Sequence, residues 1–152
     1  MAAKFTFFGK GDRVEVGIPE FETRSAADEN DAVWLDSTVT VQAGAFVGSF
    51  KASFTPDDLV SLYEQLKRAL TSLNEEVFFQ NTGGGLALSI SLDSGGITSI
   101  TGVAHPDHLR EGMLLFRIDT DHIALVDTLR ELENALREFP AKQAKDQERF
   151  WS

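Results

Sequence analysis

The sequence contains no cysteine, which excludes a disulfide framework, a thiol nucleophile and a thiolate metal site. It also has no apolar run near the ~18 residues that a helix needs to cross a bilayer. The N-terminal stretch MAAKFTFFGKGD is interrupted and lacks the continuous apolar region of a signal peptide. These absences predict a cytoplasmic protein in a reducing compartment.

Positive charge is scarce as well, because 24 Asp and Glu face 14 Lys and Arg and give a formal net charge of -10 at pH 7. This charge disfavours nucleic acid or an anionic membrane as a direct partner. The same negative charge favours a basic protein partner, because its electrostatic attraction would speed the approach of a positively charged protein. Many bacterial cytosolic proteins are acidic merely because negative charge keeps them soluble, so the charge does not identify the partner.

Catalytic motifs are missing: there is no GxSxG elbow, no HExxH and no calcium-loop spacing. The segment HPDH, His105 to His108, is the most suggestive of a metal, but a transition-metal site needs several converging ligands and His122 lies far along the chain. The glycine-rich NTGGG from Asn81 leads into a strand pattern, whereas a phosphate loop opens a helix. We therefore expect no enzyme, no metal and no cofactor.

The first half of the chain reads as hairpins. Strands are expected over Lys4–Gly9 and Arg13–Pro19, followed by a solvated acidic loop over Glu20–Asp31. Period-two alternation then predicts two further strands, whose core-facing residues are Leu35, Val39, Val41, Phe46, Phe50, Ala52 and Phe54. The outward-facing residues are Asp36, Thr38, Thr40, Val47, Ser49, Lys51 and Ser53.

A helix start follows in FTPDDL, with Thr55 as N-cap, Pro56 at the first helical position and Asp58 at the third. The apolar stripe of this helix is Leu59, Leu62, Tyr63, Leu66, Leu70 and Leu73.

The second half repeats this plan. Its expected strands are Glu76–Gln80, Leu86–Leu92, Ile97–Ala104 and Met113–Asp119. A helix with an acidic start and a stop at Pro140 follows, and its stripe is Leu125, Leu129, Leu132, Leu136 and Phe139. We predict an α+β fold, with a largely antiparallel sheet built of hairpins, two amphipathic helices packed on it and a strand-strand-helix order used twice. Residues 1–140 would form a single domain, and 141–152 a polar tail whose Phe150 and Trp151 either dock or stay free.

Trp34 is unexpected, because alternation puts it on the same outward face as Asp36 and Thr38. It either packs under the N-terminal hairpin, against Phe5, Phe7 or Phe8, or serves as an aromatic anchor at the edge of the acidic loop. Aromatic anchors inside a charged rim are typical of protein–protein hot spots.

The stretches NDAVWLDSTVTV and GAFVGSFKASFTPDDLVSLYEQLKRAL, over roughly residues 30–70, resemble the N-terminal half of the WapI-type immunity proteins and related bacterial domains. The resemblance implies a protein that neutralises a toxin domain by binding it, without catalysis.

Our leading hypothesis is a non-catalytic acidic binding protein, of the immunity type, that meets a basic protein partner. Two alternatives stay open: a ligand-binding or enzymatic domain with a pocket between sheet and helices, and a homodimer that pairs through an exposed sheet edge or face. The expected partner-binding residues are Glu20, Glu22, Asp28, Glu29, Asp31, Trp34 and Asp36.

Overall fold

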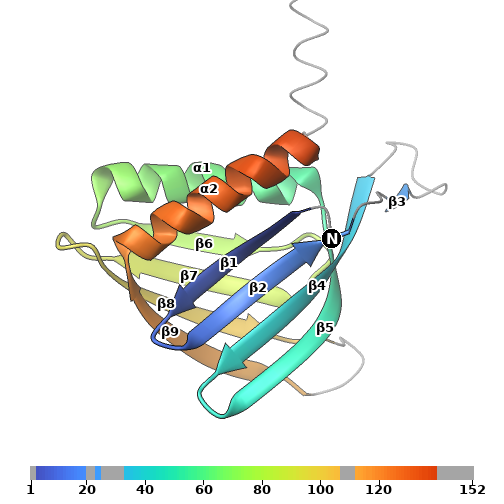
Figure 1. The fold of residues 1–152 in the computed structure, drawn as a ribbon, viewed down its shortest axis with the longest axis horizontal. Helices are drawn as coiled ribbons and strands as arrows, with labels where there is room; N and C mark the ends of the chain where they lie inside the picture. Colours follow the sequence, from blue (N-terminus) through green and yellow to red (C-terminus); the bar gives the residue numbers. More distant parts are fainter. Residues whose placement is uncertain (1–2, 20–22, 25–32, 107–111, 140–152) are drawn as a thin grey trace, which may run out of the picture.

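Two antiparallel sheets face each other, and two helices lie along one side of the pair (Figure 1). The computed structural model describes residues 3–19, 23–24, 33–106 and 112–139. The first sheet contains β1 (Ala3–Gly9), β2 (Asp12–Ile18), β3 (Thr23–Arg24), β4 (Val33–Ala43) and β5 (Phe46–Phe54). The second contains β6 (Glu76–Gln80), β7 (Leu86–Leu92), β8 (Ile97–Ala104) and β9 (Leu114–Asp121), in that order across the sheet.

In the first sheet the long strand β4 pairs with β2 on one side and with β5 on the other. β1 pairs with β2 and forms the sheet edge nearest the helices (Figure 1). The β1–β2 turn places Lys10 and Gly11 at φ 47° and 87°, the left-handed backbone that a two-residue hairpin requires. β5 forms the opposite edge of this sheet.

The helices α1 (Pro56–Ser72) and α2 (His122–Glu138) begin where the sequence places their caps. Thr55 caps α1 in a capping box, since its hydroxyl accepts from the Asp58 amide while the Asp58 carboxylate accepts from the Thr55 amide. The Asp121 carboxylate caps α2 by accepting from the Ala124 amide at 3.0 Å.

Side chains of the helices hydrogen-bond to the outer edges of two strands. Along β1, the Thr6 amide donates to the Glu131 carboxylate at 3.1 Å, and the Thr6 carbonyl accepts from the Thr128 hydroxyl at 2.6 Å. Along β6, the Phe78 amide donates to the Gln65 side chain at 3.2 Å. The helices therefore close one side of the sandwich and satisfy strand edges that would otherwise offer unpaired backbone groups.

One apolar core cluster joins both sheets and both helices. Phe54 of the first sheet and Phe79 of the second stack with ring centroids 6.2 Å apart, which ties the two sheets together. The buried stripe of α1 contributes Leu59, Leu62 and Leu66 to this core. No described helix is long and apolar enough to cross a membrane.

The predicted fold class is confirmed: the fold is α+β, with antiparallel hairpins and two amphipathic helices. The strands divide into two sheets, each followed in the chain by one helix, so the order sheet then helix occurs twice. The last strand begins at Leu114, one residue after its predicted start, and continues to Asp121. The expected tail, 141–152, lies outside the described residues.

Two local predictions were wrong. Within the predicted loop Glu20–Asp31, residues Thr23 and Arg24 form the short strand β3, which pairs with Trp34 and Val33. Phe46 was expected in the core but is 66% exposed. It lies at the tip of the β4–β5 hairpin, which extends past the rest of the sandwich (Figure 1). Its side chain is on the inward face of the strand, but at the tip this face meets solvent and not the core.

Candidate functional site

The predicted partner-binding residues divide into two groups. Five of them lie outside the described residues: Glu20, Glu22, Asp28, Glu29 and Asp31. The other two, Trp34 and Asp36, lie on the outward face of β4, as strand alternation predicts. Asp36 is exposed and Trp34 is partly buried.

Trp34 is separated from the core of the molecule. Its neighbour Leu35 is fully buried, so the indole lies on the opposite face of the sheet from Phe5 and Phe7, which belong to the core. Phe8 shares the outward face but aligns with Gln42 through Arg13, eight residues along β4 or roughly 27 Å away at the usual rise per residue. Of the two alternatives for Trp34, packing against Phe5, Phe7 or Phe8 is therefore wrong. Its backbone instead pairs with Thr23 of β3.

The outward face of β4 and β5 carries a row of cross-strand hydrogen bonds between polar side chains. Ser53 donates to the Asp36 carboxylate at 2.9 Å, and the Lys51 ammonium donates to the Thr38 hydroxyl at 2.8 Å. Thr40 and Ser49 continue the row, with their hydroxyl oxygens 3.2 Å apart. This polar face, defined by those three pairs, is held in register by its own side chains and begins next to Trp34.

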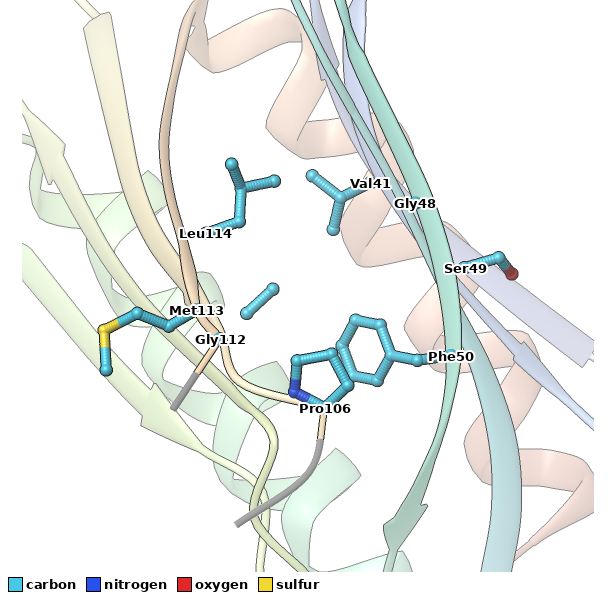
Figure 2. Close-up of a pocket in the computed structure, with 9 residues that line it drawn as sticks. Val41, Gly48, Ser49, Phe50, Pro106, Gly112, Met113 and Leu114 are labelled. Atoms are coloured by element: carbon cyan, nitrogen blue, oxygen red, sulfur yellow. The ribbon is translucent and has the colours of Figure 1, made fainter. Parts of the chain in front are cut away.

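An apolar hollow opens between the two sheets near the β5 edge. Figure 2 shows Val41 and Phe50 on one wall, Leu114 on the opposite wall and Pro106 between them, with their side chains pointing towards one another. The hollow measures about 320 Å³, and Ala104, Gly48, Ser49, Gly112 and Met113 complete its lining. The described residues that line it carry no titratable side chain, and their apolar surface can accept an apolar group. The alternative hypothesis placed a pocket between sheet and helices, whereas this hollow lies between two sheets.

Large apolar side chains are exposed on the segments that border this hollow, although the Met113 side chain points away from it (Figure 2). Phe46 and Val47 at the hairpin tip are 66% and 69% exposed, and Met113 beside β9 is 57% exposed. Sequence reasoning missed them as a group, because Phe46 was assigned to the core and Met113 to a strand. Only Val47 could have been predicted as an exposed apolar side chain, because alternation places this apolar residue at an outward position of β5.

The glycine-rich loop after β6 has a structural role. Asn81 is 2% exposed; its amide nitrogen donates to the carbonyls of Ser53 and Gly84 at 2.9 and 2.7 Å, and its oxygen accepts from the Leu86 amide at 3.1 Å. A Cβ built on Gly83 would lie 2.5 Å from the Ser53 carbonyl oxygen, so only glycine allows this approach. The loop therefore fastens the C-terminal end of β5 to the second sheet.

The histidines do not form a metal site in the described part of the chain, which contains no group of three His, Asp or Glu side chains that could hold an ion. His105 is partly buried, while His108 lies outside the described residues. His122 begins α2, where its Nδ1 is buried against Gly96 and has no hydrogen-bond partner among the described residues.

Glu131 has a pKa raised above its ordinary value. Partial burial disfavours the charged carboxylate more strongly than the hydrogen bond from the Thr6 amide favours it.

The model of the Immunity protein WapI-like family matches residues 5–140, most of the chain and both sheets. No curated protein matches the sequence.

Proposed function

Because the chain belongs to the WapI-like immunity protein family, we propose that it neutralises a toxin domain by binding it directly, without catalysis. The observation that carries this proposal is the family match over residues 5–140. The proposed contact surface is the polar face of β4 and β5, with Trp34 at one end of it. A surface whose side chains are already held by hydrogen bonds to one another loses less conformational entropy when a partner docks on it.

The charge of the molecule favours a basic toxin domain. At a net charge of -10 the chain attracts a cationic partner and raises its association rate at low salt. In this proposal the acidic segment around residues 20–36 steers the toxin, and Trp34 is the anchor that becomes buried in the complex.

The first experiment is co-expression of this chain with candidate toxin domains drawn from the genes that flank its own, scored by rescue of growth. Trp34→Ala is expected to weaken the complex by about 1–3 kcal/mol and to reduce rescue, as loss of an interfacial aromatic anchor does. Phe78→Ala is the matched control, since Phe78 is an aromatic residue 62% exposed on the outer face of the other sheet. If both variants rescue like the wild type, Trp34 is not an anchor; if the wild type itself fails to rescue or bind, the proposed function is wrong.

Charge is tested separately by association kinetics at several salt concentrations. Neutralising Glu22, Asp28, Glu29 and Asp31 to Gln or Asn should slow association and flatten its salt dependence, with little change in dissociation. The control makes the same change in net charge on exposed acids elsewhere, at Asp57, Glu64, Glu76 and Glu138. If both sets of substitutions slow association equally, the association rate depends on the net charge of the molecule and not on the position of the acidic segment.

A further inference from the structure

The outer edge of β5 carries backbone groups that the fold leaves unpaired. The β4–β5 hairpin closes on the pair Ala43 and Phe46, and the pairing runs in register to Leu35 and Phe54. In an antiparallel ladder, alternate residues turn both N–H and C=O away from the partner strand. The Ser53 carbonyl is one of these outward groups, since it accepts from Gly83 and Asn81 of the second sheet. By the same alternation the outward groups of β5 before it belong to Val47, Ser49 and Lys51.

The described residues supply no hydrogen-bond partner to the backbone of these three residues. The edges of β1 and β6 differ, because Thr6 is paired by α2 and Phe78 by Gln65 of α1. On the β9 edge, Gly9 of β1 approaches so closely that a Cβ there would lie 2.3 Å from the Asp119 carbonyl oxygen. β5 therefore offers an open strand edge of three successive outward residues, and an open edge is a template for another strand.

The apolar hollow lies directly beside this edge. Gly48 and Phe50, the inward neighbours of Ser49 on β5, both line it. Side chains of an added strand would alternate between the two faces of the sheet, so every second one would point towards the hollow. The exposed Phe46, which shares the inward face of β5 with Gly48 and Phe50, adds apolar surface at the hairpin tip.

We propose that the open edge of β5 pairs with an extended segment of the toxin domain, and that an apolar side chain of this segment enters the hollow. This inference rests on the proposed function and specifies how the partner is held: backbone pairing supplies affinity and the hollow supplies specificity. Charge favours such a partner over a second copy of the chain, because two molecules of net charge -10 repel each other. The segment is expected to carry an apolar residue with basic neighbours.

Ser49→Pro tests the backbone pairing. Proline removes the outward N–H of Ser49 and places its ring on the open edge, without removing a hydrogen bond to β4, and proline is tolerated on edge strands. Ser49→Ala is the matched control, because it loses the same hydroxyl contact with Thr40 but keeps the N–H. Both variants lose any contribution of the Ser49 hydroxyl to the polar face, so the comparison between them isolates the N–H: we expect Ser49→Pro to bind the toxin domain at least about tenfold more weakly than Ser49→Ala.

Gly48→Val tests the hollow independently. A Cβ built on Gly48 meets no atom within 4 Å, so position 48 has room for a side chain at the mouth of the hollow, and the fold of the variant is checked by circular dichroism. Gly48→Val should weaken toxin binding, while Gly48→Ala, which fills less of the mouth, should have a smaller effect.

Hydrogen exchange of the wild-type amides gives a readout that needs no variant. Toxin binding should slow exchange at Val47, Ser49 and Lys51. If the wild type binds the toxin while these amides stay unprotected and Ser49→Pro binds equally well, the edge proposal is overturned and the proposed function stands. If the free chain is a dimer by analytical ultracentrifugation and Ser49→Pro makes it monomeric, the edge holds a second copy and the proposed occupant is wrong. If the wild type does not bind the toxin at all, the proposed function fails first.

Discussion

Replacing Asp58 by alanine should destabilise the fold by about 2–3 kcal/mol, more than its place in the first turn of a helix suggests. The carboxylate is 8% exposed and accepts three hydrogen bonds. One comes from the Thr55 amide at 2.9 Å within the capping box, and two come from Thr82, from the amide at 2.9 Å and the hydroxyl at 2.7 Å. The same side chain thus caps α1 and holds the loop that leads from β6 to β7.

The magnitude follows from those three contacts. Loss of the capping interaction costs about 1 kcal/mol. An N–H left without a partner costs about 1–3 kcal/mol when it is fully buried. Thr82 is exposed, so water can replace part of its lost hydrogen bonding. The Thr82 contacts therefore contribute an amount at the lower end of this range to the free energy of unfolding. Asn at position 58 keeps one acceptor oxygen and should fall between wild type and Ala.

The assay is urea denaturation followed by circular dichroism, with an unchanged slope taken as the sign that only stability changed. Asp57→Ala is the control, because Asp57 is also acidic and in the first turn but is exposed. It should cost no more than about 0.5 kcal/mol. Equal effects of the two substitutions would refute the reasoning, since they would show that only the helix dipole is involved.

Two further predictions concern stability. Because burial raises the pKa of Glu131 above 4.5, ionisation of this carboxyl costs the folded state, and stability should rise as pH falls through the raised pKa. Glu131→Gln, which can still accept from Thr6, should therefore gain stability relative to wild type near neutral pH and lose that advantage below 4.5; a constant difference in denaturation midpoints across this range would count against it. Gly102→Ala should cost about 1–3 kcal/mol in the urea assay, because its Cβ would lie 2.1 Å from the Phe116 ring, whereas Gly48→Ala meets open space and should cost little. A small effect at Gly102 would mean that the ring moves aside freely.

Local patterns determined most of the secondary structure. The strands over Glu76–Gln80, Leu86–Leu92 and Ile97–Ala104 have the predicted bounds, because period-two alternation between glycine-rich turns has no competing helical pattern. The capping box at Thr55 is equally local, since both of its hydrogen bonds join residues three apart. The outward direction of Trp34 and Asp36 followed from alternation alone.

Properties that depend on distant residues needed the tertiary structure. Alternation assigns Phe46 to an inward face but does not reveal that the sandwich ends before the hairpin tip. It also does not show that Trp34 lies away from the N-terminal hairpin, or that Thr23 and Arg24 pair beside it. These outcomes depend on which strands become neighbours, and the hydrophobic pattern within a strand carries no information on its partner.

The sequence by itself determined the two helices, every strand except β3, the cap of α1, the acidic charge and the resemblance that the family match confirmed. The tertiary structure alone decided the division into two sheets and the capping of β1 and β6 by helix side chains. It also decided the open edge of β5 beside an apolar hollow. The physical reason is that an edge or a hollow exists only where packing ends, and packing is set by contacts between residues far apart in the chain.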